Sequence, residues 1–208
     1  MSSAKKIASW ADKLRDISAL GLEFCKDIYD RERYQEIQNI AMNMLAFATK
    51  TSVDRFEPIR TTIFSRPSPL VGGDAAVIDS FGHILLIQRA DNEMWAMPGG
   101  LLEVGETPAE GVLREVEEET GYKCKATSLI GIFDSRLCGT IYPLHLYHFT
   151  FLCLPIDEKP NVPRHKHESL DIEWFHEDSL PENIDPGHKT RIPEAFRVWW
   201  GDLRPFFD

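Results

Sequence analysis

The segment from Gly99 to Tyr122 constrains this chain more than any other, because it specifies its own helix. Thr107 is a natural N-cap residue, and a glutamate three positions later completes a capping box. Pro108 suits the first helical position, and Gly121 supplies the left-handed residue that ends a helix. The sequence therefore predicts a helix over residues 108–120 that follows a glycine-flanked loop.

Acidic side chains crowd this predicted helix. Glu115, Glu118 and Glu119 occupy positions i, i+3 and i+4, which fall on one side of a helix and bring the carboxylates within reach of one another. Unless a counter-charge is present, the carboxylates repel one another and their pKa values rise. A hard divalent cation such as Mg²⁺ or Mn²⁺ prefers oxygen ligands and would turn this repulsion into a binding site. Arg114 precedes Glu118 by one turn and is expected to pair with it.

The same segment resembles the signature of the Nudix hydrolases. That signature is Gly, five residues, Glu, seven residues, Arg-Glu, an aliphatic residue, any residue, Glu-Glu, any residue, Gly and a final aliphatic residue. The matching positions are Gly100, Glu106, Arg114, Glu115, Val116, Glu118, Glu119 and Gly121. The one departure is Tyr122 in the final position, which affects packing rather than chemistry. The resemblance covers about residues 70–180 and implies an α/β fold, a Nudix-type α/β/α sandwich with a mixed sheet.

The resemblance also implies roles for single residues. The expected metal ligands are Glu115, Glu118, Glu119 and the carbonyl of Gly99. Bound Mg²⁺ or Mn²⁺ would neutralise a pyrophosphate bridge and activate the water that cleaves it. Glu115 is expected as a ligand or a base, and Arg114 is expected to hold a carboxylate in place.

Residues outside the signature complete the expected site. Glu168 resembles, by its position in a late loop, the residue that supplies a general base or another ligand in Nudix domains. His165 and His167 lie beside it and either touch substrate phosphate or are simply solvated. The residues expected to contact substrate are Arg89, Trp95 and Tyr142. The alternatives are a surface ion pair for Arg89 and core positions for the aromatic residues.

The expected substrate is a nucleoside diphosphate linked to a small group, with a CDP-choline-like compound favoured. ADP-ribose is the second candidate, because Nudix enzymes that cleave it commonly carry a proline where this chain has Leu137. A noncanonical nucleoside triphosphate is the third. A different class of function is a noncatalytic ligand sensor on a Nudix fold, but such proteins typically lose glutamates that this chain keeps.

Composition narrows the class of partner and the compartment. The chain has 208 residues, of which 43% are hydrophobic and 27% charged, as in an ordinary soluble globular protein. A net charge of −10 disfavours binding to nucleic acid or to anionic membranes. The four cysteines are widely spaced, with no CxxC pair, and are interpreted as buried thiols in a reducing compartment. With no apolar run of membrane-spanning length and no signal pattern, a cytoplasmic location is expected.

The first part of the chain has a different character. Apolar residues from Ile7 to Ile28 recur at spacings of three and four, which predicts an amphipathic helix with a weak point at Gly21. A second helix is expected to begin at Asp30 as N-cap, and the two would form a hairpin. A hairpin with so many large apolar residues is expected to pack on the catalytic domain or on another copy of itself. We expect residues 1–60 to form this hairpin and residues 61–208 the catalytic domain.

The hairpin is also similar to the helical extension of a Nudix subgroup that includes CDP-choline and ADP-ribose pyrophosphatases. Residues 26–34 and 37–41 carry this likeness. In that subgroup the extension helps to form a homodimer, so a homodimer is expected here. A monomeric cap over the catalytic domain is the alternative.

The remaining chain alternates strand patterns with one further helix. Residues 51–72, rich in proline and glycine, are interpreted as a connector. A closing helix is expected over residues 192–200. The expected strands are residues 75–78, 84–87, 95–97, 129–133, 144–153 and 172–175.

Overall fold

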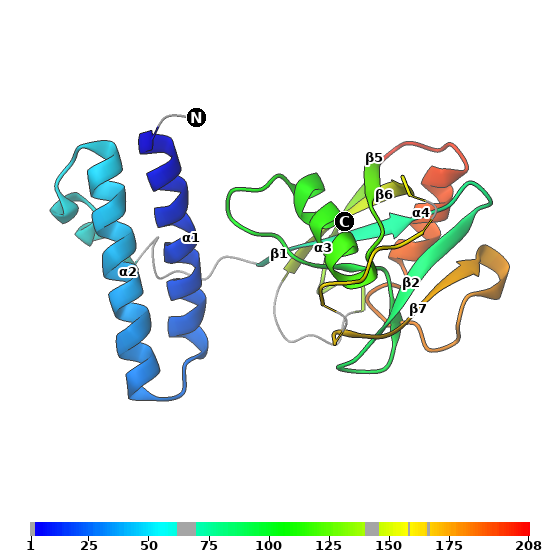
Figure 1. Ribbon diagram of the computed structural model, residues 1–208, viewed down its shortest axis with the longest axis horizontal. Coiled ribbons are helices and arrows are strands. Elements are labelled where there is room, and N and C mark those ends of the chain that lie inside the picture. The colour runs from blue at the N-terminus through cyan, green and yellow to red at the C-terminus, as the bar shows by residue number, and fades with distance from the viewer. Residues whose placement is uncertain (1–2, 62–69, 140–145, 158, 166) are drawn as a thin grey trace. The chain divides into compact units, whose positions relative to one another are not determined.

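The computed structural model describes residues 3–61, 70–139, 146–157, 159–165 and 167–208 (Figure 1). The chain divides into two compact units, each described here by itself. The first is Met1–Ser68 with Glu103–Gly105, and the second is Pro69–Leu102 with Glu106–Asp208. Within the described part of the chain, none of the helices is both long and apolar enough to span a membrane.

The first unit is a hairpin of two helices, α1 (Ser3–Phe24) and α2 (Ile28–Thr49), which lie side by side in Figure 1. Two short 3₁₀ helices follow, η1 (Val53–Arg55) and η2 (Glu57–Ile59). Asp27, not Asp30, is the N-cap of α2, because its carboxylate accepts the backbone N–H of Asp30 at 2.9 Å. The expected N-cap was therefore wrong by three residues, and Ile28 belongs to the second helix.

Small side chains form the interface between the two helices. Ala11, Ser18 and Ala41 are fully buried. Gly21 matters most, since a Cβ atom there would lie 2.3 Å from the ring of Tyr34. This glycine is thus the point where the helices approach closely, although it weakens α1 as a helix.

Several large apolar side chains of the hairpin are exposed, although Met42 of α2 is fully buried. On α1, three of them follow one another at intervals of seven residues, and each keeps more than half of its surface: Trp10 (56%), Ile17 (52%) and Phe24 (53%). On α2, Phe47 is 74% exposed. The hairpin alone therefore leaves an apolar stripe uncovered, as its sequence pattern suggested.

The second unit contains two sheets. The larger has the strand order β4-β1-β6-β5-β8, with parallel β1–β6 and β5–β8 pairs and antiparallel pairs elsewhere, so it is mixed. Its strands are β1 (Leu70–Val77), β4 (Gly99–Leu101), β5 (Cys124–Asp134), β6 (Leu146–Pro155) and β8 (Phe206–Phe207). The smaller, antiparallel sheet has the order β3-β2-β7. Its strands are β2 (His83–Arg89), β3 (Trp95–Ala96) and β7 (Ser169–His176).

Helices cover both faces of the larger sheet, with η4 (Glu177–Ser179) between β7 and the last helix. Ala75 and Val77 of β1 pack in one core cluster with α3 (Pro108–Thr120). Ala76 and Ile78, the alternate residues, pack in another with α4 (Arg191–Trp199). Because successive residues of a strand face opposite sides, β1 lies between two hydrophobic layers. The expected α/β/α sandwich with a mixed sheet is confirmed.

The first strand begins at Leu70, earlier than the predicted residue 75, so Gly72 of the expected connector lies within β1. The next residue, Gly73, faces α3, and a Cβ atom there would lie 2.4 Å from Val112. The helix α3 begins and ends where the sequence predicted. All four cysteines are free thiols, and only Cys25 is half-buried rather than buried. Burial raises the pKa of the Cys124 thiol to about 12, so it is unreactive at neutral pH.

Candidate functional site

The position of α3 is fixed by its two ends. At the start, the Thr107 N–H donates to Glu110 at 2.8 Å and the Glu110 N–H donates to the Thr107 hydroxyl at 3.3 Å, which is the predicted capping box. At the end, Gly121 has φ +75°, and a Cβ atom there would lie 2.0 Å from the Asn161 carbonyl oxygen. Both ends are therefore set by residues that few others can replace.

Arg114 connects the carboxylates at the start of the site. Its guanidinium donates two bonds to Glu106, at 2.9 and 3.1 Å. The same group donates to Glu115 at 2.7 Å and to Glu118 at 3.1 Å. The expected pairing with Glu118 is present, but Glu106 is the larger cause of the raised pKa of Arg114. One cation thus holds three carboxylates in place.

Glu119 lies apart from this ion-pair network. It is 6% exposed, and its carboxylate accepts the Gly99 N–H at 2.9 Å. Burial raises the pKa of Glu119 to about 8, and the charges of Glu115 and Glu168 add to the rise. Burial likewise raises the pKa of Glu115. At neutral pH, without a counter-ion, the Glu119 carboxyl is therefore largely protonated.

Glycines let the loop approach these carboxylates. A Cβ atom on Gly100 would lie 2.7 Å from the Glu115 carboxyl group. A Cβ atom on Gly99 would lie 2.3 Å from the carbonyl oxygen of Gly73, which lies on the neighbouring strand β1. The two glycines thus allow β4 to pass between β1 and the acidic side of α3.

The late loop expected to contribute to the site does contact α3. The His165 N–H donates to the Glu118 carbonyl at 2.9 Å, and His165 Nδ1 lies 3.9 Å from the Glu118 carboxylate. Glu168 Oε1 lies 3.8 Å from His165 Nδ1 and 3.6 Å from His167 Nε2. The fold therefore brings Glu118 and Glu168, 50 residues apart in the sequence, within 4 Å of the same histidine, His165.

We call Glu115, Glu118 and Glu119 the acidic cluster. Their carboxylates do not point towards one common position, although the helical spacing had predicted that they would. Among the residues that the structure describes, no three carboxylate, histidine or cysteine side chains form a ready-made metal site. Arg114 draws two of the carboxylates towards itself, and Glu119 turns inward to Gly99. The donor set still fits a hard cation, since three carboxylates and only one arginine leave uncompensated negative charge.

The three residues expected to contact substrate have different outcomes. Arg89 forms a two-bond ion pair with Asp91, at 2.7 and 2.9 Å. Trp95 is 8% exposed and packs edge-on against Phe175, with ring centroids 4.9 Å apart. This position favours the alternative expected for Trp95, packing in the core, over a stacking contact with substrate. Tyr142 lies outside the described residues.

A buried polar cluster behind β4 was missed from the sequence. Asp74 of β1 forms an ion pair with Arg191, the first residue of α4, and both are nearly inaccessible. Burial alone would raise the pKa of Asp74, but Arg191 and then His148 hold it well below its usual range. His188 accepts the Met97 N–H at 3.3 Å, and burial lowers its pKa, so it is neutral. The available signal was an aspartate inside an otherwise apolar strand.

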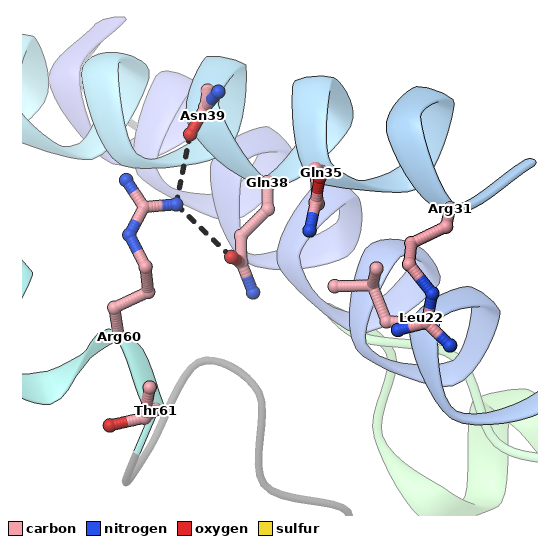
Figure 2. Close-up of a pocket in the computed structure, with 7 residues that line it drawn as sticks. All are labelled: Leu22, Arg31, Gln35, Gln38, Asn39, Arg60 and Thr61. Atoms are coloured by element: carbon pink, nitrogen blue, oxygen red, sulfur yellow. Dashed lines mark hydrogen bonds between the residues drawn. The ribbon is translucent and has the colours of Figure 1, made fainter. Parts of the chain in front are cut away.

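The N-terminal unit has a pocket with a volume of about 480 Å³, shown in Figure 2. Arg60 lies at its edge, with two bonds to Glu57 at 2.7 and 2.9 Å. Its remaining terminal nitrogen donates to Gln38 at 3.1 Å and to Asn39 at 2.9 Å. Because these bonds engage all three guanidinium nitrogens, Arg60 connects η2 to α2.

Comparisons with known proteins agree with this geometry. The family model described as "NUDIX domain" matches residues 70–195, and the model described as "UDP-X-like, N-terminal oligomerisation domain" matches residues 5–59. A relative in Bacillus subtilis (strain 168), YjhB, whose provisional name is ADP-ribose pyrophosphatase, is 31% identical over 93% of this chain and 90% of its own.

Two solved structures extend the comparison. The crystal structure of a UDP-X diphosphatase is 28% identical, with a TM-score of 0.59 and 98% of each chain covered. An ADP-ribose pyrophosphatase from Streptococcus suis is 23% identical, with a TM-score of 0.58 over 68% of this chain and 100% of its own. At that identity the second structure supports the fold alone.

Proposed function

Because the chain belongs to the Nudix hydrolases, which act on phosphorus anhydrides, we propose that it is a Mg²⁺-dependent pyrophosphohydrolase of nucleoside diphosphates linked to a small group. The observation that carries the proposal is the position of Glu118, which Arg114 holds at 3.1 Å with His165 and Glu168 beside it. This arrangement combines oriented carboxylates with a second carboxylate that can accept a proton from water.

The proposed metal ligands are Glu115, Glu118, Glu119 and the Gly99 carbonyl. A bound Mg²⁺ would neutralise charge on the pyrophosphate and lower the pKa of a water. Glu119 would lose its proton on metal binding, and Arg114 would keep Glu118 and Glu115 oriented. Water would add to one phosphorus, the bridging P–O bond would break, and Glu168 would take the proton of the water.

We favour a CDP-choline-like substrate, followed by ADP-ribose and then a nucleoside triphosphate. The names of the relatives support a nucleoside diphosphate-linked class, since they refer to ADP-ribose and to UDP-linked compounds. The site for the nucleotide would include Arg89, which is held at the end of β2. The missing proline at position 137 is the reason for placing ADP-ribose second.

We also propose that residues 1–60 act as a dimerisation hairpin and residues 61–208 as the catalytic domain. The match to a model described as an oligomerisation domain supports this division. The uncovered stripe of Trp10, Ile17 and Phe24 supports a homodimer, because each side chain exposes more than half of its surface. The four free thiols favour a reducing compartment, for which we propose the cytoplasm.

A substrate panel tests the proposed function. The protein is incubated with CDP-choline, ADP-ribose, a UDP-sugar and a nucleoside triphosphate, in Mg²⁺ and in chelator, and products are separated by chromatography. We expect CMP and phosphocholine from CDP-choline in Mg²⁺ and no products in chelator. Binding of these compounds without any turnover would instead support a sensor.

A further inference from the structure

We propose that His148 of β6 is a substrate-binding residue whose Nε2 atom accepts a hydrogen bond from a hydroxyl or amino group of the bound nucleotide. The inference rests on the proposed function, because it assigns a contact to the substrate of the same site. It adds a specificity residue that lies outside the acidic helix and its loops.

The surroundings of His148 change along one face of the larger sheet. On the face that α4 covers, Ala76 of β1 and Ile78, just after the strand, are both fully buried in the core. Further towards the start of β1 the same face presents Asp74 and then Gly72. Arg191, at the first turn of α4, pairs with Asp74. Apolar packing under α4 therefore gives way to polar groups where that helix begins.

The imidazole of His148 packs closely against Gly72. The register pairs Gly72 with His148 on one side and with Leu101 of β4 on the other. A Cβ atom placed on Gly72 would lie 3.2 Å from His148 Nδ1 and 3.5 Å from the Gly100 carbonyl oxygen. The ring can thus lie against this strand because Gly72 has no side chain, and the Gly100 carbonyl lies beside the same glycine.

Asp74 orients the ring of His148. His148 Nδ1 is buried without a well-aligned partner, and the Asp74 carboxylate lies 3.4 Å from it. That carboxylate is held by Arg191 and also accepts the Thr150 hydroxyl at 3.4 Å. A carboxylate facing Nδ1 favours the tautomer with its proton there, which leaves Nε2 as an acceptor.

The other ring nitrogen is the one available to a ligand. The side chain of His148 is 16% exposed. Nδ1 is a fully buried atom without a hydrogen-bond partner, whereas Nε2 is not. No hydrogen bond from a described residue reaches Nε2, so its acceptor site is open to solvent. An oriented acceptor with an open side suits a hydroxyl or amino donor better than a phosphate, which has no donor when ionised.

The glycine pair on β4 connects this acceptor to the acidic cluster. One side of Gly100 faces the Glu115 carboxyl, since a Cβ atom there would lie 2.7 Å from it. The carbonyl oxygen of the same residue lies 3.5 Å from a Cβ atom placed on Gly72, the residue paired with His148. The acidic cluster and His148 lie on opposite faces of the sheet, and β4 is its edge strand. A nucleotide with its pyrophosphate at the acidic cluster would therefore extend its sugar or base around this edge, past Gly100, towards His148.

Two amide variants test which ring nitrogen of His148 contacts the ligand. Asn places its amide near the position of Nδ1, and Gln places its amide near the position of Nε2. With the best substrate of the panel, we expect His148→Asn to raise KM about tenfold, with kcat changed by no more than about twofold. We expect His148→Gln to raise KM less. His176→Gln is the matched control, because His176 also faces an aspartate, at 2.7 Å, but is half exposed on β7. An unchanged KM in His148→Asn would overturn the proposal.

Substrate analogues identify the donor. If the donor is a ribose hydroxyl, the 2′- or 3′-deoxy substrate should lose the KM difference between wild type and His148→Asn. If it is a base amino group, a uridine substrate should lose that difference and the deoxy substrates should keep it. A difference that persists with every analogue would show that His148 acts through the structure, which contradicts the proposal.

Binding measurements keep this inference distinct from the proposed function. We would record imidazole ¹⁵N shifts of the full chain with a nonhydrolysable α,β-methylene nucleoside diphosphate. A shift of the His148 Nε2 resonance on ligand addition, even without turnover in the panel, would support His148 while the proposed hydrolysis fails. No shift would overturn the role of His148 and leave the hydrolysis standing.

A second variant covers the case in which His148→Asn does not fold. Gly72→Ala would bring a methyl group within 3.2 Å of Nδ1, closer than a Cβ atom normally lies, so the imidazole would have to shift. Because the shift would move Nε2 relative to the ligand, we expect KM to rise several-fold with an unchanged far-UV circular dichroism spectrum. A folded Gly72→Ala protein with wild-type KM would contradict the contact between His148 and the ligand.

Discussion

At the scale of single residues, Arg114 decides how the signature carboxylates lie. It bonds to Glu106, Glu115 and Glu118, so a single positive charge faces three negative ones. Glu119 avoids adding a fourth charge because its pKa is raised to about 8. The negative charge of the site is thus reduced without metal, yet enough remains for a divalent cation to neutralise.

Glu118 is the residue whose loss should affect turnover most. We expect Glu118→Gln to lower kcat by about a hundredfold or more, because the amide cannot replace a charged ligand. Glu117→Gln is the matched control, since Glu117 is the half-buried neighbour on the same helix and has no assigned role. Rates are measured in saturating Mg²⁺, with thermal midpoints to confirm folding. Near-normal kcat in Glu118→Gln would remove it from the site.

Glu119 should make the free energy of unfolding of the protein depend on pH. Its pKa is about 8 in the folded chain, against an ordinary value of 4.5, so between these values the folded state holds a proton that the unfolded state has lost. Stability from this group is therefore full below pH 4.5 and falls as pH rises towards 8, by at most about 1.4 kcal/mol per pH unit.

The test compares wild type with Glu119→Gln in chelator. Urea unfolding is measured from pH 5 to pH 8, and the difference in free energy of unfolding between the two proteins is plotted against pH. We expect wild type to lose stability relative to the variant as pH rises. A difference that does not change with pH would contradict the raised pKa.

At the scale of elements, the hairpin depends on close approach more than on helix propensity. Ala normally stabilises a helix interior by about 0.8–1 kcal/mol relative to Gly. At Gly21, however, the added Cβ atom would lie 2.3 Å from the ring of Tyr34. The steric effect should exceed the gain, because the contact is with the body of an aromatic ring.

We therefore expect Gly21→Ala to lower the stability of the full chain by about 1–3 kcal/mol. Glu32→Ala is the control, because Glu32 is exposed on α2 and its replacement changes helix propensity without a clash. Thermal and urea unfolding give the two differences. A stabilised Gly21→Ala protein would show that helix propensity outweighs the packing of Tyr34.

At the scale of the whole molecule, the uncovered apolar stripe of α1 should control assembly. Replacing both Trp10 and Phe24 by Glu puts charges into a surface that a partner copy would bury. We expect the mass in solution to fall from that of a dimer to that of a monomer. Light scattering after gel filtration measures it.

The control for assembly changes a more exposed apolar residue of the second unit. Phe81 is 79% exposed in the turn before β2, so Phe81→Glu should leave the mass unchanged. If wild type is already monomeric, or if the Trp10 and Phe24 variant stays dimeric, the stripe is not the interface.

The sequence by itself determined the features that depend on near neighbours. The limits of α3 follow from Thr107 and Gly121, whose effects act within a few residues. The 3.6-residue period places Glu118 one turn after Arg114, and the two side chains pair as predicted. The hairpin and most strands were predicted for the same reason. One local prediction was nevertheless wrong. Asp30 was expected to be the N-cap of α2, but Asp27 accepts the capping hydrogen bond.

Only the tertiary structure decided which distant residues meet and which side chains are covered. Asp74 and Arg191 are 117 residues apart, and their pairing depends on where α4 crosses the sheet. Trp95 was moved from an expected substrate contact to the core by the packing of β3 against β7 residues. Strand order and burial are properties of the assembled layers, so periodicity and short-range spacing carry no information about them.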